Sequence, residues 1–259
     1  MGRALVTGAG NRLGRAMALE LARQGHDVAV HYHSSGEGAK AAVAEIRKMG
    51  RNAVALRADL LQEAEVTPLI PAAASALGGP MTVLINSASI FEYDTLQSAT
   101  RNTWDDHFES NLRAPFVLMQ ELAAQVPDPV KDAHGEPLAQ GLVINMIDQR
   151  VQKLTPEFMT YTLAKMGLWA LTQTAAQALA PRVRVNGIGP GPTLRATRQS
   201  AAHFAAQRAA TVLKRGANVS DITGALAYLL NAPAVTGQLI CVDGGQHLCW
   251  QTPDVLGVE

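Results

Sequence analysis

The sequence predicts an α/β protein that is built on a doubly wound parallel sheet. Short apolar segments alternate along the chain with longer segments of helical periodicity. A glycine-rich turn, Gly8-Ala9-Gly10-Asn11, joins the first apolar segment to the first helical one. With 47% hydrophobic and 17% charged residues, the chain can bury a substantial core. Strands that alternate with helices pair in parallel, because each helix carries the chain back across the sheet.

The first part of the chain alternates regularly. Strands are expected at residues 3–7, 27–32, 52–56 and 81–85, and helices at residues 12–24, 37–49 and 62–77. Leu13, Met17 and Leu21 form one apolar stripe on the first helix, and glycines follow the first two helices and can end them. Pro68 and Pro71 make the third helix imperfect, because proline lacks the backbone donor that a helix interior needs.

The second part continues the alternation less regularly. A helix at residues 103–125, capped by Thr103, precedes a loop at residues 126–140 that is rich in Pro, Asp and Gly. Strands are expected at residues 142–146, 182–187 and 238–242, and a helix at residues 161–180. The segment at residues 193–213 is expected to be mobile. No internal repeat or domain boundary is evident, so residues 1–259 are expected to form one domain.

Charge and cysteine content narrow the class of protein. The 22 Lys and Arg residues balance the 22 Asp and Glu residues, so nothing indicates nucleic-acid binding. Cys241 and Cys249 have no metal-binding spacing, which indicates a reducing compartment. No signal-peptide pattern and no apolar run of about 18 residues are present, so we expect no membrane contact and a cytoplasmic location.

Tyr161 and Lys165 are the first candidate catalytic pair. They are four residues apart in a helical segment, so they share one helix face. An ammonium group favours a neighbouring phenolate, so Lys165 is expected to lower the pKa of Tyr161 and suit it to acid–base catalysis. The same spacing occurs on ordinary solvated helices, so the pair needs support from other motifs.

The glycine-rich turn indicates a phosphate-binding site. Glycines allow the backbone to approach a pyrophosphate, and the helix that follows offers free N–H groups. The second strand does not end in the acidic residue that would bind the ribose hydroxyls of NAD. It ends instead in His31-Tyr32-His33-Ser34-Ser35, whose hydroxyls and imidazoles can hold a 2′-phosphate, so NADP(H) is expected. The two histidines can also be ordinary strand-end residues, and no third ligand suggests a metal site.

These motifs together resemble those of the short-chain dehydrogenase/reductase family over nearly the whole chain. The matching pieces are the turn at residues 7–14, Asp59-Leu60, Asn86-Ser87-Ala88, Asn111, Tyr161 with Lys165, Gly189-Pro190-Gly191 with Thr193, and Asp243-Gly244-Gly245. The resemblance implies a Rossmann fold of about seven strands in one domain, a segment inserted on the substrate side at about residues 190–215, a nicotinamide cofactor and a homotetramer.

The resemblance also implies roles for individual residues. Tyr161 would donate the proton, Lys165 would hold the ribose and lower the pKa of Tyr161, and Asn111 would hold a water-linked proton relay. The implied cofactor-binding residues are Gly8, Arg12, Leu13, His31, His33, Ser34, Ser35, Asp59, Leu60, Asn86, Ser87, Ala88, Lys165, Pro190, Gly191 and Thr193.

Two departures from the family pattern point to a subgroup. Arg12 stands where the family's turn usually has Gly, and Asp148 stands where it usually has the catalytic Ser, thirteen residues before the Tyr. The pair is similar to that of pteridine reductases and the related bacterial dihydromonapterin/dihydrofolate reductases. The segment 86–91, the loop at 126–140 and Asn145-Met146-Ile147-Asp148 also match. In that subgroup an Arg commonly occupies the place of Ser34, which weakens the expected grip on a 2′-phosphate.

The subgroup resemblance implies a set of substrate contacts. The implied residues are Arg12, Ser89, Phe91, Asp148 and Tyr161. A carboxylate can accept paired hydrogen bonds from an aminopyrimidine or relay a proton, and an aromatic ring can stack on a pterin. Core packing is the alternative for Phe91, and capping of a turn is the alternative for Asp148.

Three functions remain open on the sequence. The first is NADPH-dependent reduction of the C=N bond of a dihydropterin or dihydrofolate-like small molecule. The second is reduction of a carbonyl, or oxidation of an alcohol, by an ordinary short-chain enzyme. The third is a non-catalytic protein that senses cofactor ratio. The presence of Tyr161, Lys165 and Asn111 argues against the third function, and Phe91 with Asp148 favours the first over the second.

Overall fold

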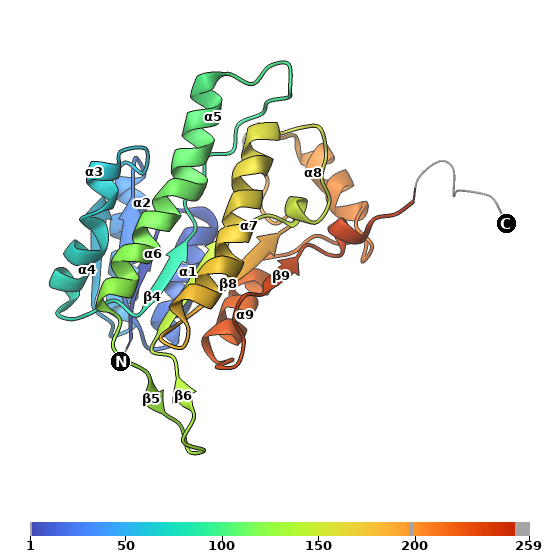
Figure 1. Ribbon diagram of the computed structural model, residues 1–259. Helices are drawn as coiled ribbons and strands as arrows, with labels where there is room; N and C mark the ends of the chain where they lie inside the picture. The colour runs from blue at the N-terminus through green and yellow to red at the C-terminus, as the bar shows by residue number, and fades with distance from the viewer. Residues whose placement is uncertain (1, 197–198, 252–259) are drawn as a thin grey trace.

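The computed structural model describes residues 2–196 and 199–251. Its centre is a seven-stranded sheet in the order β3-β2-β1-β4-β7-β8-β9, in which every neighbouring pair is parallel (Figure 1). The strands are β1 (Arg3–Val6), β2 (Asp27–Tyr32), β3 (Ala53–Arg57), β4 (Val83–Asn86), β7 (Gly141–Met146), β8 (Val183–Pro190) and β9 (Leu239–Val242). This confirms the predicted doubly wound parallel sheet.

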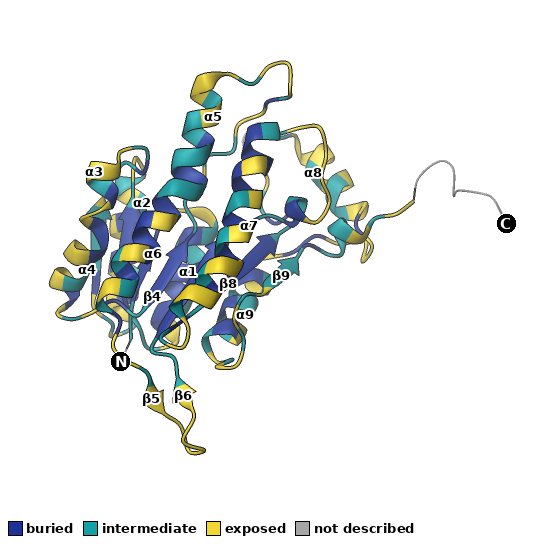
Figure 2. Ribbon diagram, viewed as in Figure 1, coloured by how far each residue is buried: buried dark blue, intermediate teal, exposed yellow. Residues whose placement is uncertain are grey.

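Helices cover both faces of the sheet. One face packs against α1 (Arg12–Arg23), α2 (Gly36–Lys48) and α9 (Val219–Leu230), and the other against α4 (Leu69–Leu77), α6 (Ala114–Gln125) and α7 (Met159–Leu179). Successive residues of a strand point to opposite faces, so Ala4 and Val6 join one core cluster while Leu5 joins the other. Figure 2 shows the central strands and the inward faces of these helices as mostly buried, while β9, at the edge of the sheet, is of intermediate exposure.

The strand order reverses between β1 and β4. The chain winds outward from β1 to β2 and β3, and then crosses back to β4 and on to β7. Neighbouring crossover helices then lie on opposite faces, which opens a crevice beyond the carboxyl ends of the strands. This crevice is where a parallel α/β sheet binds its ligands.

Two predicted helices are interrupted. The helix expected at residues 62–77 is split at Pro68 into α3 (Glu63–Val66) and α4, as its prolines indicated. The helix expected at residues 103–125 consists of α5 (Arg101–Phe108), the π-helical turn η1 (Glu109–Arg113) and α6.

The prediction that Thr103 caps the fourth helix was wrong. The helix begins two residues earlier and its N-cap is Thr100, which accepts a hydrogen bond from the backbone N–H of Thr103 at 3.2 Å. The Thr103 hydroxyl accepts in return from the N–H of Thr100 at 2.9 Å. Because a capping box uses hydroxyls at both positions, either threonine could be mistaken for the cap.

Four further features go beyond the sequence prediction. The loop at residues 126–140 forms a hairpin, β5 (Val130–Lys131) with β6 (Pro137–Leu138), that projects from the body of the molecule (Figure 1). The segment expected to be mobile contains α8 (Ala201–Ala209), and α9 was missed altogether. Two short 3-10 turns, η2 (Gln149–Val151) and η3 (Gln246–Leu248), follow β7 and β9.

Among the described helices, none is long and apolar enough to cross a membrane.

Candidate active site

A cavity of about 900 Å³ opens at the carboxyl ends of the central strands. Most of the residues singled out from the sequence line it: Gly8, Arg12, Leu13, His31, His33, Ser34, Ser35, Asp59, Leu60, Ser87, Ala88, Ser89, Phe91, Asp148, Tyr161, Lys165, Pro190, Gly191 and Thr193. Asn86 and Asn111 are the predicted site residues that do not line it. The fold therefore brings the glycine-rich turn and the Tyr161–Lys165 pair to one cavity.

Tyr161 and Asp148 form a direct pair in this cavity. The Tyr161 hydroxyl donates to Asp148 Oδ2 at 3.0 Å. Tyr161 lies in the first turn of α7, while Asp148 follows the last strand residue of β7 by two positions. Lys165 lies one turn along α7, with its Nζ 5.6 Å from the centre of the Tyr161 ring, and it donates to the Met146 carbonyl oxygen at 2.8 Å. Tyr161 and Lys165 are buried, and Asp148 is half-buried.

The prediction that Lys165 lowers the pKa of Tyr161 was wrong for this arrangement. Burial and the Asp148 carboxylate raise the pKa of Tyr161 well above its ordinary value, because both disfavour the phenolate. The carboxylate oxygen is hydrogen-bonded to the phenol, whereas the ammonium group lies farther away and beside the ring. Burial also lowers the pKa of Lys165 to about 8 and raises the pKa of Asp148.

Asp148 uses its two oxygens for different purposes. Oδ1 accepts from the backbone N–H of Arg150 at 2.8 Å and caps η2, while Oδ2 accepts from Tyr161. The capping interpretation is therefore confirmed, and the second oxygen of the same side chain contacts Tyr161 in the cavity. The cap fixes the carboxylate rotamer, so the second oxygen is held toward the tyrosine.

Aromatic rings form one wall beside this pair. Phe91 lies 4.5 Å from Tyr161, centre to centre, at 58°, and stacks on Phe158 at 4.5 Å and 17°. Phe91 lines the cavity and belongs to none of the core clusters among the described residues, so it is not simple core packing. Phe158 is the N-cap of α7 with a left-handed backbone, φ 56°, and it was not foreseen from the sequence.

A buried polar chain, also unforeseen, ties this wall to α7. The backbone N–H of Glu92 donates to His107 Nε2 at 3.1 Å, so the imidazole proton lies on Nδ1, which contacts the Thr160 hydroxyl at 2.7 Å. Thr160 in turn donates to the Asp94 carboxylate. His107, Thr160 and Asp94 are all buried. The chain fixes the loop that carries Phe91 against the start of the helix that carries Tyr161.

The glycine-rich turn has the shape of a phosphate cradle. Gly8 has φ +64°, and a Cβ there would lie 2.9 Å from the Ala88 backbone. A Cβ on Gly14 would lie 2.3 Å from the Gly8 carbonyl oxygen. Asn11, the N-cap of α1, makes no side-chain cap bond, so the first N–H groups of that helix remain available to an anion. The turn therefore fits the pyrophosphate of a dinucleotide.

His31 supports this turn rather than offering a charge to a phosphate. Its Nδ1 accepts from the backbone N–H of Gly8 at 3.1 Å, and Nε2 contacts the Ala58 carbonyl oxygen at 3.1 Å. Burial lowers the pKa of His31 to about 4, so the ring is neutral at physiological pH. The expectation that His31 helps hold a 2′-phosphate is corrected accordingly. His33, Ser34 and Ser35 remain at the cavity surface, with His33 Nε2 4.0 Å from an Asp59 oxygen.

Arg12, which stands where the family's turn usually has Gly, keeps the backbone conformation of a glycine and uses its side chain for a contact of its own. Its φ is 50°, which is the left-handed region that glycine adopts without cost and that costs another residue about 1 kcal/mol. Its guanidinium donates to the carbonyl oxygens of Leu194 and Arg195, both at 3.1 Å. In this structure Arg12 therefore joins the turn to the segment that follows β8, instead of reaching the predicted ring or phosphate contacts.

The two asparagines lie behind the cavity wall. Asn86 donates to Asn145 Oδ1 at 2.8 Å, and Asn145 donates to Thr172 at 2.9 Å, so Asn86 joins β4 to β7 and α7 and does not face the cavity. Its predicted role as a lining cofactor contact is corrected to a supporting one. Asn111 lies in η1 and donates to the Ile90 carbonyl oxygen at 2.9 Å. Its Oδ1 is buried without a partner in the described structure, as an acceptor for a relay water would be.

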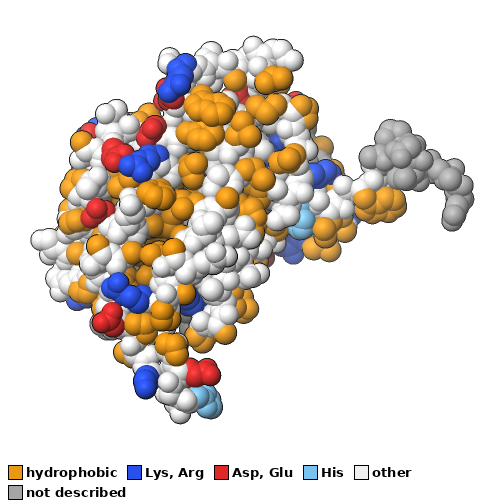
Figure 3. Space-filling model, viewed as in Figure 1, with side chains coloured by type: hydrophobic (Ala, Val, Ile, Leu, Met, Phe, Trp, Pro, Cys, Tyr) orange, Lys and Arg blue, Asp and Glu red, His pale blue; other side chains and the backbone are white. Residues whose placement is uncertain are grey.

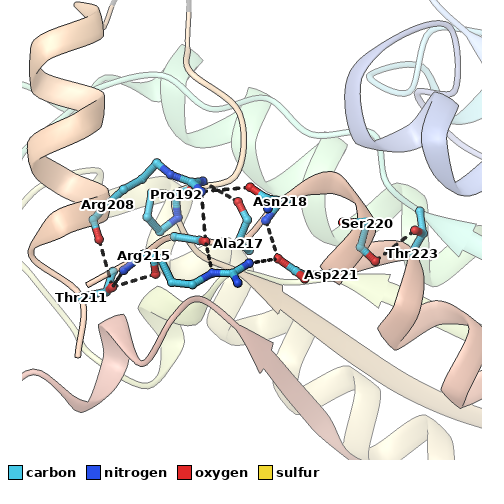
Figure 4. Close-up of polar contacts among 10 residues, drawn as sticks. Pro192, Arg208, Thr211, Arg215, Ala217, Asn218, Ser220, Asp221 and Thr223 are labelled. Carbon is cyan, nitrogen blue, oxygen red and sulfur yellow. Dashed lines mark hydrogen bonds and ion pairs between the residues drawn. The ribbon is translucent and has the colours of Figure 1, made fainter. Parts of the chain in front are cut away.

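The segment after β8 closes one side of the cavity and is anchored by Arg208. Figure 4 shows its guanidinium among backbone oxygens: it donates to Pro192 at 2.8 Å and to Gly216 at 3.1 Å, and also to the Asn218 side chain at 3.0 Å. Beside it, Arg215 pairs with Asp221 at 2.9 Å. These contacts fix α8 against the start of α9. His203, Phe204 and Gln207 on α8 line the cavity, together with Gln199, which precedes the helix.

Comparisons with known proteins agree with this geometry. A family model described as enoyl-(acyl carrier protein) reductase matches residues 8–247. The 3-oxoacyl-[acyl-carrier-protein] reductase FabG of Staphylococcus epidermidis is 33% identical over 252 residues, which are 95% of this chain and 98% of the relative.

Solved structures of high similarity include two from Brucella. FolM alternative dihydrofolate reductase 1 from Brucella canis, complexed with NADP, is 39% identical with a TM-score of 0.90, covering 98% of this chain and 97% of that one. The same protein from Brucella suis, in complex with NADP, is 40% identical with a TM-score of 0.90, covering 98% of both chains.

Proposed function

The chain belongs to the short-chain dehydrogenase/reductase family, and we propose that it is an NADPH-dependent enzyme that reduces the C=N bond of a dihydropterin or dihydrofolate-like substrate. The observation that carries this proposal is the hydrogen bond from Tyr161 to Asp148. A carboxyl group here, where the family usually has a serine hydroxyl, adds a second proton-carrying group to the site. Reduction of C=N, like that of C=O, takes one hydride and one proton, but a carboxyl group can in addition accept paired hydrogen bonds from the aminopyrimidine edge of a pterin.

The relatives support two activities within this family. The Brucella proteins are named as dihydrofolate reductases and share 39% and 40% identity with this chain, whereas FabG is named as a reductase of 3-oxoacyl groups, which are carbonyl compounds. The local features favour the first activity. Phe91 offers a flat wall beside Tyr161, and Asp148 replaces the hydroxyl that suffices for a carbonyl.

The cavity residues fit a nicotinamide cofactor of the NADP type. The turn at residues 8–14 would hold the pyrophosphate, Lys165 the ribose next to the nicotinamide, and Ser34 and Ser35 the 2′-phosphate at the end of β2. When bound, the nicotinamide supplies the hydride. No carboxylate follows β2 directly to bind a free 2′-hydroxyl or repel a phosphate. This favours NADPH over NADH. Because His31 is neutral and position 34 has Ser rather than Arg, the 2′-phosphate would be bound by the serine hydroxyls and His33.

The proton is proposed to come from Tyr161, with Asp148 as its source. Because the phenolate of Tyr161 is strongly disfavoured, the hydroxyl must regain a proton as it gives one away. A protonated Asp148 can supply it, since Oδ2 lies at hydrogen-bond distance and burial raises the pKa of the acid. The substrate nitrogen then gains one proton, Tyr161 stays neutral, and Asp148 ends as a carboxylate.

A panel of substrates tests the proposal. Dihydrofolate, dihydrobiopterin, dihydromonapterin and simple ketones are assayed with NADPH and with NADH. We expect kcat/KM to be higher for dihydrofolate and the dihydropterins than for any ketone, and to be higher with NADPH than with NADH. Rapid reduction of ketones without reduction of any pterin would establish the carbonyl-reductase alternative, and a clear preference for NADH would refute the cofactor assignment.

We also propose that the protein is a homotetramer that uses the face formed by α5, α6 and α7. Apolar side chains gather over these helices in Figure 3, and Trp104, Phe116, Leu163 and Met166 are among the exposed ones. An exposed patch of this kind marks an interface between proteins. Light scattering should give four copies per particle, and Met166→Glu should reduce that number. Val130→Glu, on the projecting hairpin, should leave it unchanged, and a wild-type monomer would contradict the proposal.

A further inference from the structure

Arg150 is a charged residue of the cavity to which the proposed reaction gives no task. It follows Asp148 by two positions, lies in η2 and lines the same cavity. Its guanidinium lies over the Phe158 ring, with Cζ 5.0 Å from the ring centre, and Nη1 donates to the Thr155 hydroxyl at 2.6 Å. Stacking on an aromatic ring holds the planar guanidinium in one orientation.

The two other Lys or Arg side chains that line the cavity already donate hydrogen bonds to backbone oxygens. Lys165 donates to the Met146 carbonyl oxygen, and Arg12 donates to two carbonyl oxygens after β8. By contrast, Nε of Arg150 is buried and has no hydrogen-bond partner within residues 2–196 and 199–251. None of the ion pairs in that part of the chain includes Arg150 either. A guanidinium that lines a binding cavity without a carboxylate partner indicates a negatively charged group on the ligand.

The position of Arg150 indicates which part of a ligand it meets. Thr155, its hydroxyl partner, is exposed, and so is Glu157, which lines the cavity and makes no ion pair with Arg150. Tyr161 is buried and Asp148 is half-buried. Phe158 contacts both Phe91 and Arg150, so it separates the wall for a flat ring from the guanidinium. A ring bound against Phe91 with its reacting nitrogen at Tyr161 can therefore extend a side chain past Phe158 to Arg150.

We propose that Arg150 binds a carboxylate on the side chain of the substrate and so selects dihydrofolate-like substrates over dihydropterins with neutral side chains. This inference rests on the proposed function and names its substrate class. Guanidinium and carboxylate form two parallel charge-assisted hydrogen bonds, and the two terminal nitrogens, Nη1 and Nη2, provide a matching pair of donors. The side chain of Phe158 shields this contact from water on one side.

The test compares two substrates that share the reacting ring. Dihydrofolate carries carboxylates on its side chain and dihydrobiopterin carries none. Arg150→Gln should lower kcat/KM for dihydrofolate about tenfold or more, through KM, while dihydrobiopterin changes less than about twofold. Arg150→Lys keeps the charge but loses the planar pair of donors. Its kcat/KM for dihydrofolate should therefore lie between the values of the wild type and Arg150→Gln. Arg101→Gln, which removes an exposed charge on α5, controls for net charge and should leave both substrates unchanged.

A binding measurement completes the test without turnover. Quenching of protein fluorescence by folate and by biopterin, in the presence of NADP⁺, should weaken for folate alone in Arg150→Gln. An equal loss for both substrates, or no loss for either, would overturn the assignment of Arg150 and leave the proposed function standing. Wild-type protein that reduces neither substrate would overturn the proposed function and this inference with it.

Discussion

Tyr161→Phe should remove nearly all turnover and leave cofactor binding close to wild type. The hydroxyl is the group that donates to Asp148, and it is the proposed proton donor to the substrate. A positioned general acid contributes about 10²–10⁴ in rate, so kcat should fall by that factor. The ring remains, and with it the contacts to Phe91 at 4.5 Å and to His107 at 5.9 Å. Steady-state kinetics and NADPH titration together measure both effects.

Tyr228→Phe provides the matched control for this change. It removes the hydroxyl of an exposed tyrosine on α9, away from the cavity, and should leave kcat unchanged. If Tyr161→Phe keeps more than about a tenth of the wild-type rate, Tyr161 is not the proton donor. A loss of NADPH affinity as large as the loss of rate would instead mean that the ring or the cofactor site had moved.

Most of the fold could be predicted because its signals are local. Each buried strand is a short apolar run, and each helix that was found has a stripe or a stop residue nearby in sequence. α9 carries such a stripe in Ile222, Leu226 and Leu229, with a capping box at its start and Pro233 just beyond its end, so its signals are also local and it was overlooked. The π-helical turn at η1 could not be predicted, because its residues have the same helical periodicity as those around them.

The candidate site was only partly predictable, because part of it is assembled by contacts between distant residues. The spacing of Asp148 and Tyr161 could be matched to a family pattern, but the pKa of Tyr161 depends on which charged group comes nearer in space. Phe158 meets Phe91 across a large separation in sequence, and Asp94 meets Thr160 across 66 positions. No periodicity or motif links such residues, so the aromatic wall and its buried supports became visible only in the folded chain.

Asp148→Ser should cost the enzyme its dihydropterin activity. The carboxylate serves two partners at once, Arg150 N–H through Oδ1 and the Tyr161 hydroxyl through Oδ2, whereas a single serine oxygen reaches one of them. We expect kcat/KM for dihydropterins to fall about ten- to a hundredfold or more, with NADPH affinity little changed. The Arg150 N–H and the Tyr161 hydroxyl then compete for one serine oxygen, so the cap on η2 should weaken and the unfolding free energy should fall by up to about 1 kcal/mol, or a few degrees in Tm.

The two effects of this substitution separate the two tasks of Asp148. If dihydropterin kinetics are unchanged and Tm is lowered, Asp148 serves only as the cap of η2. The carbonyl-reductase alternative would then be favoured. Asp148→Asn is the matched variant, because its amide oxygen can still cap η2 while the side chain can no longer supply a proton. We expect Asn to restore the Tm that Ser loses and to leave the rate low.

The pH dependence of the wild-type enzyme gives the last check on Asp148. Only the protonated acid can return a proton to Tyr161, so kcat/KM for a dihydropterin should be greatest at low pH and fall as the pH rises through the pKa of Asp148. Burial raises that pKa, which moves the fall toward neutral pH from the range of an ordinary carboxyl group. In Asp148→Asn, the remaining kcat/KM should no longer fall over this pH range, because the amide does not titrate there. If kcat/KM of Asp148→Asn still falls over the same pH range, another group holds the titrating proton and the carboxylate acts only by accepting hydrogen bonds.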